Sequence, residues 1–246
     1  MILSPRSGTV RHFAGPLLCA WFFIFAASTY AQQPTPQERA RSVEARYAAA
    51  RTLQARFLER YSRGPGDVTL ESGTVYFSRP GRMRWEYESP ETKLFLADGK
   101  HVWFYVPADR TATRAKTKES ADWHTPLALL AGKTRKGMFA RMCGRIEAVE
   151  PAKAGAGPYA AFAFRCVAKA KDSPFSELLL EGDELHRITR LLIREPGGIE
   201  TEFRFAEWRQ NPLLQEALFH FSAPPGVAIV EEAALAPKEP PAPPKP

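Results

Sequence analysis

The apolar residues in the body of the chain follow two different periods. From Pro36 to Arg51 they recur every three or four positions, at Ala40, Val43, Tyr47 and Ala50, while charged residues take many of the other positions. This spacing predicts one amphipathic helix. Beyond it the apolar residues alternate with polar ones, which is the period of strands that bury one face.

Short runs with this alternation continue almost to the end of the chain, and turn-forming residues separate them. Asp98-Gly99 is a strong hairpin signal, and Pro196-Gly197-Gly198 separates two later runs. The pattern predicts an antiparallel meander of about ten strands. The strand-like runs are 53–63, 69–79, 83–88, 93–97, 101–106, 111–118, 176–181, 186–195, 199–208 and 219–221, and one more run lies on each side of residues 151–158.

Two short helices are predicted to interrupt these strands. In residues 125–132, Thr125 stands at the cap, Pro126 at the first helical position and Gly132 past the end, and residues 211–217 begin in the same way. The first helix is apolar on nearly every side. We therefore expect it to be covered on several sides or to contact a hydrophobic ligand.

The chain begins like an exported protein. Arg6 and Arg11 precede an uncharged run at 13–27, and small residues stand one and three positions before a cleavage site after Ala31. This order predicts a secretory signal over 1–31 that is removed from the mature protein. The alternative is an uncleaved anchor, but the run is short for a membrane span, which needs about 20 apolar residues.

The rest of the chain is predicted to form one domain at 32–230, followed by a disordered proline-rich tail at 231–246. The body has no apolar stretch long enough to span a bilayer, so we expect the mature protein to be soluble. Lipidation in the leader is not expected, because Leu18 rather than a small residue precedes Cys19.

Two cysteines remain after the leader, Cys143 and Cys166, on either side of the Gly-rich segment 151–158. A regular hairpin centred between Ala154 and Gly155 sets the two cysteines opposite each other. In an oxidising compartment this favours a structural disulfide, with about 3 kcal/mol of stabilisation in the loop-entropy model. The alternative, a redox or metal-binding pair, lacks a CxxC motif and nearby histidines.

The motifs of the common enzyme classes are missing. We find no nucleophile elbow, phosphate loop, dinucleotide fingerprint or paired metal-ligand histidines, so we expect no catalysis, no cofactor and no metal. The histidines of the mature chain are scattered. They are His101, His124, His186 and His220.

The charge of the chain, 34 basic against 27 acidic residues, is a modest excess of +7. Basic residues gather at 110–118 and 133–145, but the aromatic residues alternate as in a strand core, and an exported protein meets little nucleic acid. We therefore expect no nucleic-acid partner. A solvated basic face is the expectation, and docking to an anionic membrane or partner is the alternative.

The hairpin around residue 80 places an arginine on an apolar face. A two-residue turn would set Phe77 opposite Arg84. A three-residue loop sets Phe77 opposite Trp85 instead, and Arg79 then stands opposite Met83. Because burying a guanidinium is costly, Arg79 should reach backbone carbonyls or a carboxylate at the rim. It is either an ordinary snorkelling or salt-bridged arginine or a functional clasp.

Four motifs in order along the chain carry a resemblance to a known family. They are Arg79-Pro80 through Arg84-Trp85, Asp98 through Tyr105, Thr125-Pro126-Leu127, and Phe219-His220-Phe221 through Pro225-Gly226-Val227. Each is weak alone, but together they span most of the body. In this order and spacing the chain resembles the periplasmic outer-membrane lipoprotein carrier family, LolA.

This resemblance implies an α+β fold, an unclosed and curved antiparallel β-sheet (a half-barrel) whose concave apolar face is lidded by helices. Members of the family take acylated lipoproteins from an inner-membrane ATP-binding-cassette transporter and pass them to an outer-membrane lipoprotein receptor. The resemblance also implies that Arg79 contacts the lid in the closed form and that the lid opens when lipid enters. We expect a monomeric carrier.

We expect the interior of the sheet to be a space kept for acyl chains rather than a filled core, although each lining residue has ordinary core packing as its alternative. The sequence does not show which face of the strands at 94–106 and 203–205 lines this space, because both faces there are partly apolar. The expected lipid-binding residues are Val43, Tyr47, Phe77, Met83, Trp85, Tyr87, Leu94, Leu96, Trp103, Leu127, Leu130, Phe203 and Phe205.

Three other functions fit the same architecture. An outer-membrane receptor would be lipidated and would carry a protruding apolar loop, and residues 89–92 are too polar for that loop. A sensor of stray lipoproteins would need a second domain. A carrier of another lipid or glycolipid is the strongest alternative. The cysteine pair, the long tail and the more basic body depart from the family pattern.

Overall fold

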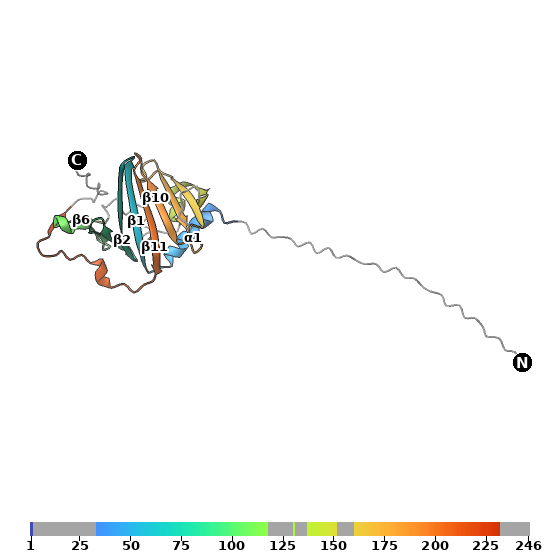
Figure 1. Ribbon diagram of the computed structural model, residues 1–246, viewed down its shortest axis with the longest axis horizontal. Coiled ribbons are helices and arrows are strands. Elements are labelled where there is room, and N and C mark those ends of the chain that lie inside the picture. Colours follow the sequence, from blue (N-terminus) through green and yellow to red (C-terminus); the bar gives the residue numbers. More distant parts are fainter. Residues whose placement is uncertain (2–32, 118–129, 131–136, 152–159, 232–246) are drawn as a thin grey trace. The chain divides into compact units, whose positions relative to one another are not determined.

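The computed structural model describes Met1 and residues 33–117, 130, 137–151 and 160–231 (Figure 1). The chain divides into two units, Met1–Gln33 and Pro34–Pro246, and all elements below belong to the second. The expected signal segment and tail therefore lie almost entirely outside the described residues, as does the expected helix at 125–132 except for Leu130. Within the described residues, no helix is both long and apolar enough to cross a membrane.

The described residues form one unclosed sheet of twelve strands rather than about ten. The strand order is β12-β6-β5-β4-β3-β2-β1-β11-β10-β9-β8-β7, so β12 and β7 are the two edges. The elements are α1 (Pro36–Ala48), β1 (Thr52–Gly64), β2 (Asp67–Ser78), β3 (Arg82–Ser89), β4 (Lys93–Ala97), β5 (His101–Val106), η1 (Pro107–Asp109), β6 (Thr111–Lys116), α3 (Met138–Met142), β7 (Cys143–Val149), β8 (Phe162–Ala168), β9 (Glu177–Gly182), β10 (Ile188–Arg194), β11 (Glu200–Gln210), η4 (Glu216–Phe219) and β12 (Ala228–Glu231).

The sheet consists of two antiparallel arms, β1 to β6 and β7 to β11, joined by the pairing of β1 with β11 (Figure 1). The last strand departs from the predicted meander. β12 pairs parallel to β6 after the chain has crossed from the end of β11. Two predictions near the C-terminus are wrong, because residues 219–221 form no strand and the expected helix at 211–217 is replaced by the short 3-10 turn η4.

The predicted amphipathic helix is present as α1 and begins where the sequence indicates. Thr35 and Glu38 form a capping box: the Thr35 N–H donates to Glu38 Oε2 (2.7 Å) and the Glu38 N–H donates to Thr35 Oγ1 (3.3 Å). Pro36 fits at the first helical position because its missing N–H is not needed there. The buried stripe of α1 contains Ala40, Val43 and Tyr47 and packs toward β7, β8 and α3.

Tyr47 fixes the C-terminal end of α1 to the sheet. Its hydroxyl accepts a hydrogen bond from the Ile188 N–H at 2.9 Å, and Trp208 Nε1 donates to the Ile188 carbonyl at 2.7 Å. The Tyr47 and Trp208 rings meet edge to face, 5.5 Å apart. One residue of β10 is thus held by side chains from α1 and β11, at the point where the β9–β10 register shifts. An unpaired backbone group buried at this point would be costly, so the two side chains also stabilise the irregularity.

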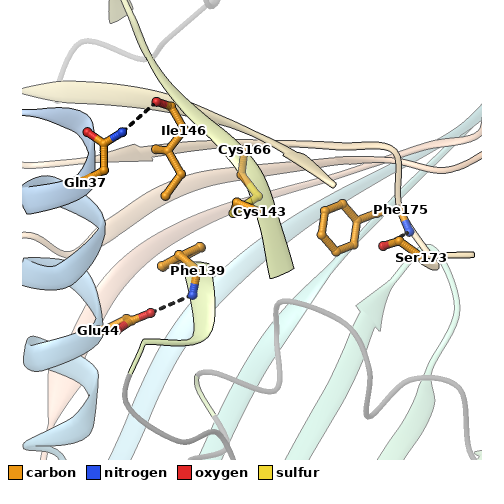
Figure 2. The surroundings of a disulfide bond; sticks show 8 residues. All are labelled: Gln37, Glu44, Phe139, Cys143, Ile146, Cys166, Ser173 and Phe175. Carbon is orange, nitrogen blue, oxygen red and sulfur yellow. Dashed lines mark hydrogen bonds between the residues drawn. A yellow bond between two sulfur atoms is a disulfide. The ribbon is translucent and has the colours of Figure 1, made fainter. Parts of the chain in front are cut away.

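The cysteines are joined as predicted, although their predicted register is wrong. Cys143 and Cys166 form a disulfide with Cα atoms 5.3 Å apart (Figure 2). Cys143 stands opposite Ala168 and Cys166 opposite Ile146, so the bonded cysteines are not directly opposed. The register shifts between Cys143 and Arg145, a bulge that a regular hairpin count does not include.

The disulfide belongs to a region where α1, α3 and the edge of the sheet are tied together (Figure 2). Glu44 of α1 accepts hydrogen bonds from the N–H groups of Gly137 (2.9 Å) and Phe139 (2.8 Å) at the start of α3. Gln37 Nε2 donates to the Ile146 carbonyl of β7 at 3.2 Å. These links hold α1 over the β7–β8 arm of the sheet.

Candidate functional site

The strand register defines which side chains share the α1 side of the sheet. Trp85 of β3 stands opposite Val75 of β2 and opposite Phe95 of β4. Phe95 in turn stands opposite Phe104 of β5. Because directly opposed residues lie on the same face, an apolar band crosses four neighbouring strands.

The centre of this band is a cluster of rings around Trp85. The Trp85 ring centroid lies 4.8 Å from that of Phe57, 5.3 Å from Phe203, 6.1 Å from Phe77 and 6.3 Å from Phe205. All four contacts are edge-to-face or tilted, which is the favourable arrangement for aromatic pairs. We call these five rings, together with Tyr87, Phe95 and Phe104, the aromatic face.

The centre of the aromatic face, formed by the five rings around and including Trp85, is packed rather than hollow, whereas Tyr87, Phe95 and Phe104 are partly buried. Trp85 and Phe57 are each 3 % exposed, and Phe203 and Phe205 are similarly buried. The described side chains therefore contact one another across the place where we expected a space kept for acyl chains, and for these residues that expectation is wrong. The same residue types satisfy both a filled and an open face, so the sequence did not distinguish them.

Most of the expected lining residues lie in one buried cluster on the α1 side, and Tyr87 packs against it. Leu127 lies outside the described residues. The members of the cluster that the sequence predicted are Val43, Tyr47, Phe77, Met83, Trp85, Leu130, Phe203 and Phe205.

The prediction that Leu94, Leu96 and Trp103 line the same space is wrong, because they lie on the opposite side of the sheet. Leu96 stands opposite Trp103, and both bury against Phe219 from the C-terminal segment. The neighbouring positions Phe95 and Phe104 face α1 instead and were missed. Apolar residues lie on both faces of β4 and β5, so the alternation in the sequence could not show which face is on the α1 side. The register of β4 against β3 decides it.

The β2–β3 hairpin has the predicted three-residue loop but a different register. Phe77 stands opposite Met83, and Val75 opposite Trp85, two positions away from the predicted pairing. The shift is an even number of residues, so the predicted face is unchanged. The loop consists of residues 79–81, and Gly81 supplies its positive φ of 77°.

Arg79 begins this loop, two residues beyond Phe77. Its backbone N–H donates to the Arg51 carbonyl at 2.9 Å, which fixes the loop to the segment between α1 and β1. The side chain is half-buried, and burial lowers the pKa of the guanidinium from its ordinary value. The implied contact with a lid falls on residues 125–132, of which only Leu130 is described.

The opposite end of the aromatic face is polar. The Tyr87 hydroxyl donates to Glu59 Oε2 at 2.9 Å, and Lys93 lies over the Tyr87 ring with Nζ 4.4 Å from its centroid. Lys93 also pairs with Glu71, and Glu71 stands opposite Glu59. This cluster ends the apolar surface at the β1–β2 hairpin.

A buried charged group on the other side of the sheet was not predicted. Arg190 donates from Nη1 to Glu181 at 2.6 Å and from Nε to Glu202 at 2.8 Å. Burial raises the pKa of Glu181, and Arg190 offsets this only in part. For Glu202, burial is again the largest single effect and raises the pKa, but the hydrogen bonds and charges of Arg190 and Arg204 together outweigh it, so the pKa is lowered. The group pairs its own charges and adds no chemistry to the aromatic face. Nor do any three histidine, cysteine or acidic residues gather as metal ligands in the described part of the chain.

Comparisons with known proteins agree with this geometry. Residues 48–222 match the family model described as outer membrane lipoprotein carrier protein LolA. An outer-membrane lipoprotein carrier protein from Methylococcus capsulatus is 33% identical over 221 residues, covering 88% of this chain and 95% of that protein. One from Nitrosospira multiformis is 30% identical over 222 residues, covering 86% of this chain and 95% of that protein.

A solved structure supports the fold. The crystal structure of an uncharacterized conserved protein from Thermus thermophilus superimposes with a TM-score of 0.50 at 16% identity, covering 80% of this chain and 98% of that one. The family match extends over more than two thirds of the chain, from the end of α1 to the segment that packs against β4 and β5. The chain therefore belongs to the LolA family of outer membrane lipoprotein carrier proteins.

Proposed function

We propose that this protein is a periplasmic carrier that binds the acyl chains of lipoproteins released from the inner membrane and delivers them to the outer membrane. The observation that carries the proposal is the aromatic face, an apolar band that crosses one side of an unclosed sheet in a member of this family. A chain with this face needs no catalytic group and no cofactor for that task.

The task follows from the cost of exposing lipid to water. Each methylene costs about 0.8 kcal/mol, so two or three long acyl chains face a penalty on the order of 30 kcal/mol. A lipoprotein therefore cannot cross an aqueous compartment unaided. A carrier must cover this surface and still release it at the destination.

A packed aromatic face meets both requirements. Acyl chains can enter only if they replace contacts that the rings of Trp85, Phe57 and Phe203 already make with one another. The closed arrangement then competes with the cargo, so the net affinity is much smaller than the gross burial of the acyl chains. Release needs no ATP hydrolysis by the carrier itself.

The proposed partners follow from the same path. Cargo comes from an inner-membrane ATP-binding-cassette transporter and goes to an outer-membrane lipoprotein receptor, and the carrier acts as a monomer. The predicted signal over 1–31 directs the chain to the periplasm. The Cys143–Cys166 disulfide suits that oxidising compartment.

Arg79 is proposed to promote cargo release by favouring the closed arrangement. If so, Arg79→Leu shifts the equilibrium toward the loaded form, and cargo accumulates on the carrier. The measurement is the intact mass of carrier purified gently from its native periplasm. We expect acylated protein bound to the wild type, and a several-fold larger loaded fraction in the variant.

The matched control is Arg82→Leu in the same hairpin. Arg82 pairs with Glu216 and lies over the Phe219 ring, on the side of the sheet away from α1. Its loss should leave the loaded fraction unchanged. A loaded fraction that does not rise in Arg79→Leu would reject the role of Arg79. Recovery of only free lipid or glycolipid, in either protein, would reject lipoproteins as the cargo.

A further inference from the structure

The loop that follows β11 presents a fully exposed leucine. Residues 211–215, called here the 211–215 loop, leave the end of β11 and lead to η4 (Figure 1). Leu214 packs against the buried cluster of Trp103 and Phe219, whereas Leu213 has a relative exposure of 104 %, as in an extended peptide. The fold therefore places one large apolar side chain of this loop in water.

The base of the loop is firmly held. The Asn211 N–H donates to the Thr52 carbonyl at 2.9 Å, and Asn211 Oδ1 accepts from the Arg51 N–H at 2.8 Å. Thr52 Oγ1 donates to the Pro212 carbonyl at 2.7 Å. Because proline fixes its own φ, the backbone just before Leu213 has little conformational freedom. A binding partner meets this side chain already in position, which lowers the entropic cost of binding.

The positions next to the loop are cationic. Arg51 and Arg209 are exposed, and neither forms an ion pair with another described residue. The acidic residues closest along the chain are engaged elsewhere, since Glu216 pairs with Arg82 and Glu207 interacts with an arginine within β1. The loop thus combines an apolar tip with two cations at its base.

Isolated exposed leucines are ordinary on protein surfaces, so exposure alone is no evidence of binding. Leu185, in the turn between β9 and β10, is such a case: it is 59 % exposed and follows Asp183 and Glu184, whose charges an anionic surface would repel. Leu213 differs in its complete exposure and in the two arginines beside it. An apolar tip with neighbouring cations is the combination that binds anionic lipid.

We propose that the 211–215 loop docks the protein on the surface of an anionic phospholipid membrane, with Leu213 inserted at the acyl boundary and Arg51 and Arg209 at the headgroups. Apolar burial and the attraction of cations to anionic lipids are the two contributions that bind a protein to such a surface. One leucine and two arginines give weak and reversible binding. Such binding suits a carrier that must leave the membrane again.

Docking by this loop would also orient the aromatic face. The Arg51 carbonyl accepts from the Arg79 N–H, while the Arg51 N–H donates to Asn211, so the 79–81 loop and the 211–215 loop adjoin the same residue. Arg79 begins its loop at one end of the aromatic face, and the polar cluster around Tyr87 ends the other. The Arg79 end is therefore the one brought to the membrane.

The test is sedimentation of the full-length mature protein, without cargo, with vesicles of equimolar phosphatidylcholine and phosphatidylglycerol at low ionic strength. The wild type should bind, and Leu213→Ser should bind about tenfold more weakly, because the insertion of one leucine side chain is lost. The matched control, Leu185→Ser, removes the same side chain from the other exposed turn and should bind like the wild type. Both leucines are exposed, so neither change should shift the unfolding midpoint.

A charge variant tests the two arginines. R51Q/R209Q should bind about tenfold more weakly than the wild type and should lose most of the salt dependence of binding. Its control, K169Q/K171Q, removes the same charge from exposed lysines of the β8–β9 connection and should keep both the affinity and the salt dependence.

A dye reports insertion directly. An environment-sensitive dye on Leu213→Cys should shift its emission to the blue on these vesicles, and the same dye on Leu185→Cys should not. The proposal is overturned if the wild type does not bind the vesicles, if Leu213→Ser binds like the wild type, or if both serine variants weaken binding equally. Because no cargo is present, failure of the carrier function cannot produce any of these results.

Discussion

Replacing Trp85 by alanine is expected to lower the free energy of unfolding by about 3–5 kcal/mol, the usual range for removing a buried tryptophan. The ring is 3 % exposed and contacts aromatic rings from β1, β2 and β11. Its removal leaves a cavity where three strands meet, and the surrounding rings cannot all move to fill it. Equilibrium unfolding in urea measures the loss.

The size of this effect distinguishes a packed aromatic face from a hollow one. A ring that projects into an empty, solvated space would cost about 1 kcal/mol or less when it is removed, because few contacts are lost. Such a small loss would contradict the packed face. Trp103→Ala is the matched control, since Trp103 is also buried, has its ring centroid 4.8 Å from that of Phe221 and lies on the other side of the sheet. It should destabilise the fold but leave cargo capture intact under conditions where both variants are folded.

Arg190→Met is expected to cost about 3–5 kcal/mol at neutral pH, because it removes the buried cation that two buried carboxylates share and leaves only the exposed Arg204 beside them. Glu181 is fully buried and Glu202 is 9 % exposed, and both accept hydrogen bonds from Arg190. Arg204→Met is the control. Arg204 also pairs with Glu202, but its side chain is 42% exposed, so its loss should cost about 1 kcal/mol or less.

The loss in free energy of unfolding caused by Arg190→Met should become smaller on acidification. In the wild type the pKa of Glu202 is lowered below its ordinary value of 4.5, so its pairing stabilises the fold above that pH and this contribution is lost as the pH falls through the folded-state pKa. The pKa of Glu181 is raised, so it contributes in the opposite sense: its stabilisation is present below pH 4.5 and is lost as the pH rises through the folded-state pKa. In the variant both carboxylates lose the buried Arg190 and keep only the exposed Arg204 nearby, so they become protonated more readily. A deficit that stays constant from neutral pH to below 4.5 would contradict this explanation.

Local patterns in the sequence predicted local structure well. The helical spacing of Val43 and Tyr47 and most of the strand boundaries follow from side-chain period and turn chemistry. The pairing of Cys143 with Cys166 was also predictable, because the two cysteines flank a single Gly-rich segment of the sequence. Their exact register was not, since a bulge near Gly144 changes the count.

The candidate site was harder to predict, for two physical reasons. In β4, positions 94, 95 and 96 are all apolar, so only the pairing of Trp85 with Phe95 shows which of them faces α1. The attachment of α1 to the sheet depends on residues more than a hundred positions apart, because the Tyr47 hydroxyl accepts from the Ile188 N–H, and no local motif marks this pair. Both features depend on how distant segments meet, which side-chain period does not determine.

The central claim is that acyl chains bind on the α1 side of the sheet, and neighbouring residues of one strand test it most directly. A photoreactive phenylalanine is placed at Phe95 or Phe104, on the aromatic face, and in parallel at Leu96 or Trp103, on the opposite side. Each protein is loaded with an acylated lipoprotein and irradiated. We predict crosslinks to the acyl chains from positions 95 and 104 and none from 96 and 103; equal or stronger crosslinking from 96 and 103 would contradict the account.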